Sequence, residues 1–338
     1  MNKKNQIICV GSSCKDTFFP TGDGVVVDTP SDLLAQKKIY FELGAKYKVD
    51  QICEAPGGCA ANVAQGLARL EIDAGALTKI GGDLVGKWIV DELKKENVDV
   101  EFVQIDKKCR TDLSSIIVDT KTKDHIIFWN RDSNEKLEIS SEKIPSAEWI
   151  FVSALNGNWR VHLDIIIEMA KKKDMKIALN PGQKNIHDDA KKVLEAIKNS
   201  QILILNKDEA IEIISESGHW KGGNINLNNE KFLLKEFLNL GCSAVVITDG
   251  NRGAWGSDGK SNYFCPGIKV DTVDTLGAGD AFTSGFLAAY LKEKDIQECL
   301  RWGAANGSNV AKFYGAKNGL LRINEIEARI ENIEIKIF

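Results

Sequence analysis

The chain has 338 residues and a formal net charge of −4, and 43% of its residues are hydrophobic. This length fits one large domain or two modest ones with a sizeable core, and the well-mixed charges exclude the broad positive surface that nucleic acids and anionic membranes select. No apolar run reaches the roughly 20 residues that span a bilayer, and the apolar centre of the first residues, IICV, is too short for a secretory signal.

The cysteines and histidines show no metal-binding or disulfide pattern. The eight cysteines include no CxxC pair, and the four histidines have no spacing typical of a zinc site. Scattered cysteines in a chain without an export signal are typically reduced and buried, which predicts a cytoplasmic protein. Together with the charge, this favours a small-molecule partner over a nucleic acid or a membrane.

Short apolar runs alternate with helical patterns along most of the chain. The first run is QIICVGS from Gln6, and others begin near residues 149, 176, 201 and 243. Strands that are buried on both faces and alternate with helices predict a parallel sheet covered on both sides. Helices are predicted at 62–70, 84–96, 162–173, 188–199, 209–216, 230–240 and 281–292.

Two segments interrupt this alternation. Residues 14–49 carry Pro, Gly and Asp around short strand-like pieces, and further on LSSIIVDT and HIIFWNR flank a TKTKD turn that predicts a hairpin. We expect insertions at about 14–49 and 109–133 to form a small sheet beside the main domain. Because no repeat or linker is visible, residues 1–338 are predicted to form a single α/β domain with this sheet as a lid.

The stretch GGDLVGKW, from Gly81, matches the GxxxxGK pattern of a phosphate-binding P-loop. However, Trp88 stands where a Ser or Thr hydroxyl should bind magnesium. We therefore predict an ordinary turn from a strand into a helix.

The stretch DTVDTLGAGDAFTSGF, from Asp271, places two glycines and a carboxylate where a helical pattern begins. Free N–H groups at the start of such a helix, at Gly277, Ala278 and Gly279, favour a bound phosphate. Beside a phosphate, Asp280 can accept the proton of a substrate hydroxyl that attacks phosphorus. Taken alone, a helix cap or a dipole-stabilising carboxylate explains Asp280 equally well.

A second glycine cluster occurs in EAPGGCAANVA, from Glu54, where Gly57 and Gly58 precede Asn62 at the start of a helix. Such a site suits a polyol hydroxyl, although small residues at a helix start often serve packing alone. Together, PGGCAANVAQGLARL and DTLGAGDAF resemble the two signatures of the ribokinase-like (PfkB) carbohydrate kinase family. The resemblance covers nearly the whole chain.

The resemblance implies a fold and an activity. The expected fold is a ribokinase-like three-layer α/β/α sandwich with a mainly parallel central sheet and a small inserted β-sheet lid. The implied activity is ATP-dependent phosphorylation of a hydroxyl group of a small sugar, as in fructokinases, ribokinases or ketodeoxygluconate kinases, with ATP and Mg²⁺ as cofactors. The catalytic base would be Asp280, and the anion hole would be the backbone of Gly277, Ala278 and Gly279.

The same resemblance assigns the remaining site residues. The substrate hydroxyls would be bound by Asp16 in VGSSCKD together with Gly57, Gly58 and Asn62. LNKDEA resembles the family's N-x-x-E element, in which Asn206 and Glu209 position magnesium and phosphates, usually through water; a helix cap is the alternative. The nucleotide loop would be ITDGNRG, with Thr248, Gly250 and Gly253. Asp274 matches a position that in many members helps to bind K⁺ or a similar ion.

The acceptor sugar is not fixed by these motifs. Arg131, in NRDSNEKL, lies where several fructokinases and ketodeoxygluconate kinases carry an arginine near the substrate. Those groups usually follow it with small residues, whereas Asn134 and Glu135 occur here. A solvent-facing arginine at the end of a lid strand is an equally good interpretation.

Two alternative functions stay open. A nucleoside kinase for adenosine-like substrates would be favoured by an aromatic-lined acceptor pocket, and a polar pocket with Arg131 pointing inward would favour a sugar or a sugar acid. A non-catalytic sensor of sugars or nucleotides is the second alternative. Whatever the function, exposed lid strands predict a homodimer joined through the lid.

Overall fold

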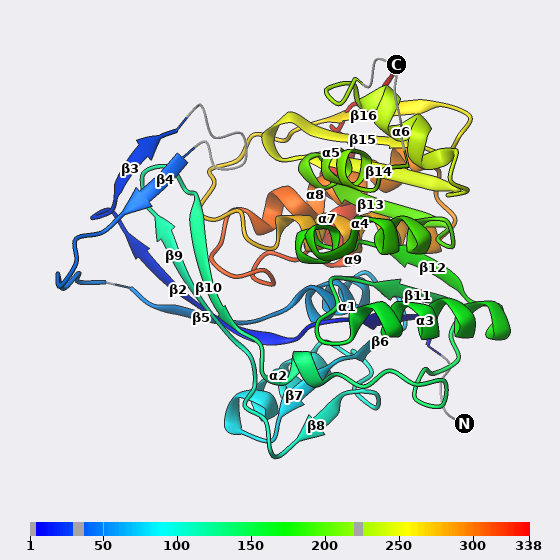
Figure 1. The fold of residues 1–338 in the computed structure, drawn as a ribbon. Coiled ribbons are helices and arrows are strands. Elements are labelled where there is room, and N and C mark those ends of the chain that lie inside the picture. Colours follow the sequence, from blue (N-terminus) through cyan, green and yellow to red (C-terminus); the bar gives the residue numbers. More distant parts are fainter. Residues whose placement is uncertain (1–4, 30–36, 50, 220–225) are drawn as a thin grey trace.

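The structure is a computed structural model, and it describes residues 5–29, 37–49, 51–219 and 226–338. Its centre is a nine-stranded sheet with the order β17-β16-β15-β14-β13-β12-β11-β1-β6 (Figure 1). Neighbouring strands from β6 to β14 run parallel, and β15, β16 and β17 pair antiparallel. The strands are β1 Ile7–Val10, β6 Ala74–Leu77, β11 Trp149–Val152, β12 Lys176–Leu179, β13 Ile202–Asn206, β14 Ala244–Asp249, β15 Gly253–Ser257, β16 Asn262–Pro266 and β17 Lys336–Ile337.

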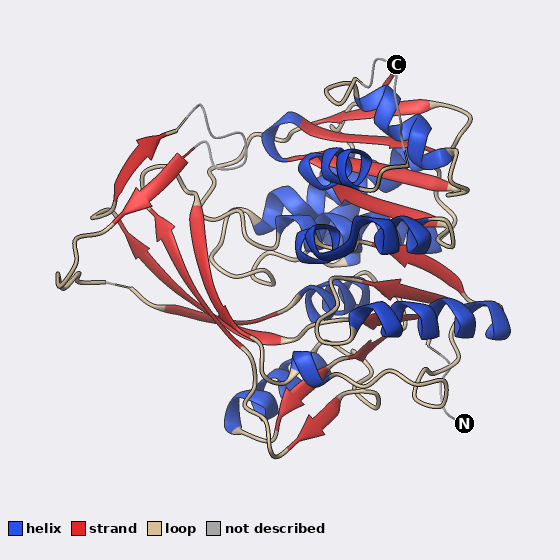
Figure 2. Cartoon of the chain, in the orientation of Figure 1, coloured by secondary structure: helices blue, strands red, loops and turns tan. Residues whose placement is uncertain are grey.

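Helices cover both faces of this sheet (Figure 2) because its strands are apolar on both sides. In β1, Ile7 and Cys9 belong to one hydrophobic core, and Ile8 and Val10 belong to the other. The predicted α/β/α arrangement with a mainly parallel sheet is confirmed. One face carries α1 Cys59–Arg69, α2 Leu84–Lys95, α7 Ala278–Leu291, α8 Ile296–Val310 and α9 Ile323–Ile330, and the other carries α3 Trp159–Lys173, α4 Gln183–Ile197, α5 Lys207–Glu216 and α6 Glu230–Leu238.

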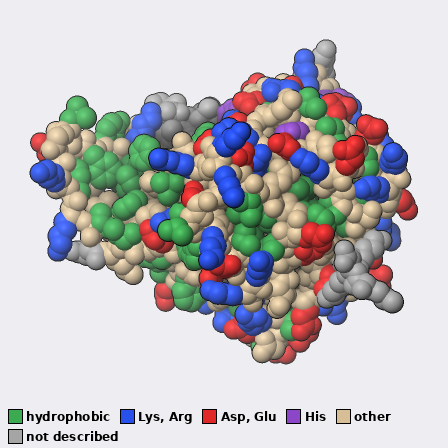
Figure 3. Space-filling model, turned by 90° about the horizontal axis from the view of Figure 1, so that it is seen from below, with side chains coloured by type: hydrophobic (Ala, Val, Ile, Leu, Met, Phe, Trp, Pro, Cys, Tyr) green, Lys and Arg blue, Asp and Glu red, His purple; other side chains and the backbone are tan. Residues whose placement is uncertain are grey.

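A second sheet stands beside the main one, at the left of Figure 1, with the order β10-β9-β2-β5. The hairpin predicted at its edge is present, since β9 and β10 pair antiparallel around the turn. The space-filling view in Figure 3 shows hydrophobic side chains gathered on this lobe. The strands are β2 Cys14–Thr21, β5 Cys53–Gly57, β9 Leu113–Asp119 and β10 His125–Asn130, with the separate pair β3 Val25–Asp28 and β4 Lys37–Tyr40 nearby.

The first predicted insertion differs in extent from this sheet. Residues 30–36 of the segment 14–49 lie outside the described residues. The strand β5, at 53–57, falls beyond that segment and pairs with β2 throughout, with Cys14 opposite Gly57. The chain thus returns directly from the second sheet into α1.

The turn at GGDLVGKW is the predicted strand-to-helix connection. The strand β7 (Lys79–Gly81), which pairs with β8 (Gln104–Asp106), ends there, and α2 begins at Leu84. Asp83 caps the helix by accepting a hydrogen bond of 2.8 Å from the backbone N–H of Gly86. Within the described part of the chain, no helix has both the length and the apolar character needed to cross a membrane.

Candidate active site

The amino-terminal ends of α1 and α7 lie side by side and bring the two glycine-rich motifs together. Close packing of the two helices depends on Gly66, because a Cβ at this position would lie 2.2 Å from Ser284 Oγ. Across the interface, Asn62 Nδ2 donates a hydrogen bond of 2.8 Å to Asp280 Oδ2. Two segments more than 200 residues apart in the sequence therefore form one polar site.

The start of α7 exposes bare backbone. Gly277 precedes the helix with a φ of 79°, and a Cβ there would lie 2.2 Å from the Cβ of Ala316. Both the left-handed conformation and the close contact require glycine. At Gly279 a Cβ would meet no atom within 4 Å, and among the described residues no side chain caps this first turn. These uncapped N–H groups at the positive end of the helix dipole form a seat for an anion.

The Asp280 carboxyl is partly buried beside other polar groups. Burial raises its pKa, hydrogen bonds from Asn62 and Cys59 oppose that rise, and the negative charge of Asp16 adds to it. Asn62 is itself 4% exposed, and its Oδ1 has no hydrogen-bond partner among the described residues. The site thus combines a carboxylate of raised pKa with a free amide oxygen, which suits proton abstraction from a hydroxyl group.

Asp16 lies on β2, between Ala55 of β5 and Ser114 of β9 in the strand register. Its side chain is 5% exposed, and Oδ1 accepts a hydrogen bond of 3.2 Å from Cys14 Sγ. A Cβ at Gly57 would lie only 1.8 Å from Asp16 Oδ2, so the glycine leaves the space that the carboxylate occupies. Burial raises the pKa of Asp16, and the hydrogen bonds and nearby positive charges lower it.

Gly58 precedes α1 with a φ of 95°, and a Cβ there would lie 2.5 Å from the backbone oxygen of Ser12. It is therefore fixed as glycine by conformation and by space. The structure brings the predicted substrate residues Asp16, Gly57, Gly58 and Asn62 together near Asp280. Their binding of a substrate stays a prediction.

A cavity of about 310 Å³ opens on the other side of the α7 start. Its apolar walls include Phe282 of α7, Ile268 of the loop after β16 and Ala304 of α8. No sequence pattern indicated Ile268 or Ala304, whereas Phe282 ends the motif DTLGAGDAF. The predicted nucleotide residues Asn206, Thr248, Gly250 and Gly253 line it, together with Ala278 and Gly279 of the anion seat.

Glu209 does not line this cavity; it forms a capping box with Asn206. Asn206 Oδ1 accepts a hydrogen bond of 2.8 Å from the Glu209 N–H, and Glu209 Oε2 accepts one of 3.0 Å from the Asn206 N–H. Burial raises the pKa of Glu209 to about 7. The helix-cap interpretation therefore describes the local contacts, and magnesium binding stays a prediction.

Asp274 is fully buried at the loop before α7. Its Oδ1 accepts a hydrogen bond of 3.1 Å from the Leu276 N–H and lies 3.6 Å from His125 Nδ1 of β10. Its Oδ2 has no hydrogen-bond partner among the described residues. Burial raises the pKa of Asp274, and the Leu276 N–H and His125 lower it. An unpaired buried oxygen fits a bound monovalent cation.

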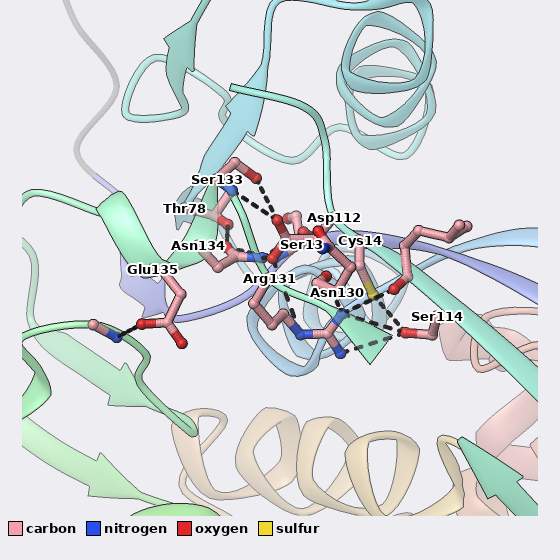
Figure 4. Close-up of polar contacts among 12 residues, drawn as sticks. Ser13, Cys14, Thr78, Asp112, Ser114, Asn130, Arg131, Ser133, Asn134 and Glu135 are labelled. Carbon is pink, nitrogen blue, oxygen red and sulfur yellow. Dashed lines mark hydrogen bonds and ion pairs between the residues drawn. The ribbon is translucent and has the colours of Figure 1, made fainter. Parts of the chain in front are cut away.

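Arg131 follows β10 and points inward (Figure 4). Only 17% of its side chain is exposed. Its guanidinium lies 3.4 and 3.5 Å from Ser114 Oγ, beside Asp16 in the register, and its Nε is 4.0 Å from Asp112 Oδ2. The solvent-facing interpretation of this arginine is therefore wrong.

Asn134 belongs to the interior beside Arg131. In the short 3₁₀ helix η1 (Asn134–Lys136), Asn134 Nδ2 donates to Asp112 Oδ2 at 2.5 Å and to the Ser13 oxygen at 2.8 Å (Figure 4). The buried carboxylate of Asp112 also accepts two hydrogen bonds from Ser133. The residues that depart from the family pattern thus hold the chain after Arg131 in place.

One charged residue near the site had no sequence signal. Lys317, in YGAKNGL, is 4% exposed, and its Nζ has no hydrogen-bond partner among the described residues. Its positive charge lowers the pKa of both Asp16 and Asp280, against the larger effect of burial. A single lysine in a loop gives no periodicity or motif from which its burial could be predicted.

Comparisons with known proteins agree with this geometry. The sequence model of the pfkB family carbohydrate kinases matches residues 31–322. An ATP-dependent ribose-1-phosphate kinase from Halopiger xanaduensis is 27% identical over 268 residues, which cover 78% of this chain and 83% of the relative. A ribokinase from Haemophilus influenzae is 25% identical over 278 residues, covering 79% and 84% of the two chains.

The fold is also that of solved kinases. The structure of Burkholderia thailandensis nucleoside kinase in complex with inosine has a TM-score of 0.78 at 18% identity and covers 96% of this chain and 97% of that chain. The family match spans most of the sequence, including both glycine-rich motifs. The chain therefore belongs to the pfkB family of carbohydrate kinases, and it is a kinase of the sugar and nucleoside type with the ribokinase fold.

Proposed function

We propose that this kinase transfers the terminal phosphoryl group of ATP to a hydroxyl group of a small sugar, as a ribokinase, fructokinase or ketodeoxygluconate kinase does. One juxtaposition supports the proposal most strongly. Asp280 directly follows Gly279, which lines the cavity of about 310 Å³, and the Asp280 carboxylate accepts a hydrogen bond from Asn62 on the side of Asp16. A base thus adjoins both a phosphate seat and a hydroxyl-binding site.

The chemistry follows from these positions. The Asp16 carboxylate and Asn62 Oδ1 would accept hydrogen bonds from sugar hydroxyl groups. Asp280 would take the proton of the attacking hydroxyl as its oxygen bonds to the γ-phosphorus and the bond to ADP breaks. The N–H groups of residues 277–279 would stabilise the charge on the transferring group. The second sheet would act as the lid of a single domain and exclude competing water.

We propose two cations for this site. Mg²⁺ keeps several waters and accepts few protein carboxylates, so Glu209 and Asn206 would hold it through water. It would neutralise charge on the phosphates. The unpaired Oδ2 of Asp274 fits a monovalent cation such as K⁺.

A nucleoside is the second candidate acceptor, because the inosine-bound kinase shares the fold. The contacts around Asp16 favour a sugar or sugar acid instead. Arg131 and Ser114 make this side polar. The guanidinium group of Arg131 also lies over the ring of Trp129, 5.3 Å from the ring centre. A non-catalytic sensor would not need the Asp280 base.

The test is an ADP-release screen of the purified protein with Mg²⁺, repeated with and without K⁺. The panel contains ketoses, aldoses, sugar acids, sugar phosphates and nucleosides. We expect turnover with a sugar, sugar acid or sugar phosphate, and faster turnover with K⁺. Turnover with nucleosides alone would make the second candidate correct. Absence of ADP release over the whole panel would contradict the kinase proposal and favour a sensor.

We also propose that the protein acts in the cytoplasm as a homodimer joined through the second sheet. Apolar side chains on this sheet are widely exposed, including Phe128 at 62% and Trp129 at 53%. Apolar patches of this kind mark association surfaces, and unpaired strand edges favour pairing between subunits.

A further inference from the structure

Lys317 lies in a segment between the strand β5, which pairs with the strand of Asp16, and the start of α7, which carries Asp280. Gly315 contacts β5, since a Cβ there would lie 2.9 Å from the Cβ of Ala55, which pairs with Asp16. The next residue, Ala316, packs against Gly277 at the start of α7. The segment 315–317 therefore touches both the strand beside the acceptor carboxylate and the turn before the base.

The ammonium group of Lys317 is buried without a partner. The residue is 4% exposed, and its Nζ donates no hydrogen bond to any of the described residues. An isolated buried charge is costly, and packing alone would be better served by an apolar side chain. A charged side chain at this buried position therefore calls for a functional explanation.

The titratable groups around Lys317 come from four elements. Cys14 and Asp16 of β2 and Glu92 of α2 favour its charged form, and Arg69 of α1 opposes it. Asp280 of α7 also responds to the lysine charge. Burial dominates and lowers the pKa of Lys317 to about 8.

The two carboxylates of the site repel each other, since the charge of Asp16 raises the pKa of Asp280. A base for a hydroxyl proton must be ionised before it can act, and a hydroxyl-binding carboxylate accepts most hydrogen bonds when it is ionised. Two ionised carboxylates in one buried site need a compensating positive charge. The segment of Lys317 contacts both the strand that pairs with Asp16 and the turn before Asp280, and the lysine charge lowers the pKa of both carboxylates.

On the basis of the proposed function, we propose that Lys317 is a positioning residue whose buried ammonium keeps Asp16 and Asp280 ionised together, so that the acceptor is bound and deprotonated near neutral pH. Lys317 does not touch the reacting atoms. It acts through the two carboxylates, and its contribution is greatest where they would otherwise be protonated.

The first test is the pH profile of kcat/KM for Lys317→Met, measured with the best acceptor. We expect the acid limb to move about one unit to higher pH, a loss of about tenfold on that limb. The loss should shrink toward pH 8.5, where both carboxylates are ionised without help. Lys317→Arg, which keeps the charge, should retain the wild-type limb, and the exposed Lys294→Met is the matched control. An equal loss at every pH, or no loss, would overturn the proposal.

The second test needs no turnover. Chemical unfolding of wild type and Lys317→Met is compared between pH 5 and pH 7, with Lys317→Gln as a substitute if the Met variant does not fold. Removing an unpaired buried charge should raise the unfolding midpoint of Lys317→Met above that of wild type. This difference in midpoint should become smaller as pH rises, because the ionised carboxylates then stabilise the lysine charge in wild type. A pH-independent difference would show that the lysine does not interact with them. This result stands even if no acceptor is turned over, which would count against the proposed function alone.

Discussion

At the residue scale, the site depends on glycines, whose missing side chains leave space for other groups. Gly57 has no side chain where Asp16 Oδ2 lies, and Gly279 has none where the anion seat opens. The sequence showed both glycines and the neighbouring carboxylates as motifs, so Asp280 and Asn62 could be placed in one site before the fold was known. It could not show the burial of Lys317 or the inward direction of Arg131, because both depend on contacts between distant segments.

Asp280→Asn should lower kcat by about 10² to 10⁴ while acceptor binding is retained. The amide can still accept the hydrogen bond from Asn62 but cannot take a proton. Steady-state kinetics measures the loss, and calorimetric titration with the acceptor measures binding. Asp271→Asn, at an exposed position in the same loop, is the control. Near-normal turnover of the Asp280 variant would reject the base assignment.

Gly57→Ala should weaken acceptor binding and destabilise the fold. The added methyl would lie 1.8 Å from Asp16 Oδ2, and overpacking of this kind costs about 1–3 kcal/mol. Urea unfolding and the KM for the acceptor measure the two effects. An unchanged KM would mean that Asp16 can move without consequence and does not bind the acceptor.

At the scale of elements, α7 carries both the proposed anion seat and the proposed base. Its position was predictable because DTLGAGDAF marks a helix start with special backbone. The helix α8, by contrast, was expected only as a carboxy-terminal helical segment near Trp302, without a range. Gly303 and Gly307 lower its helix propensity, and both lie against Phe282 of α7. The strand β6 was missed for a related reason, since AGAL has only small residues and one leucine.

Gly279→Ala should separate stability from activity. The position is helical and a Cβ meets nothing within 4 Å, so alanine should stabilise the protein by about 0.5–1 kcal/mol. The same methyl enters the anion seat, and we expect a loss of at least about tenfold in kcat. Thermal unfolding and ADP release are measured on the same sample. Full activity would show that phosphate does not bind at these N–H groups.

At the scale of the whole molecule, buried acids tie stability to pH. Burial raises the folded-state pKa of Asp16 above its ordinary value of 3.8. Its contribution to stability is therefore fully present below pH 3.8 and is lost as pH rises through the raised value. The Asn side chain of Asp16→Asn cannot ionise. The free energy of unfolding of this variant should therefore rise relative to that of wild type as pH increases through this window, and the difference should be constant at higher pH. Urea unfolding at pH 4, 5, 6 and 7 measures the difference, and a constant difference would contradict the assignment.

The proposed dimer gives a second prediction at this scale. Light scattering should report a mass of about twice the 37.2 kDa of one chain. Phe128→Glu places a charge on the exposed apolar face and should give a monomer with an intact fold. The control is Leu84→Glu, because Leu84 lies on α2, outside the second sheet, and is 86% exposed. A monomeric wild type would exclude the interface.

The strand β2 has one further consequence for how a substrate would travel. Asp16 belongs to the sheet proposed as the lid, whereas Asp280 and the cavity proposed for the nucleotide belong to the main domain. A sugar bound to Asp16 would therefore move together with the lid if the lid closes over the site. Closure would deliver the acceptor to the phosphoryl donor as well as exclude water from it.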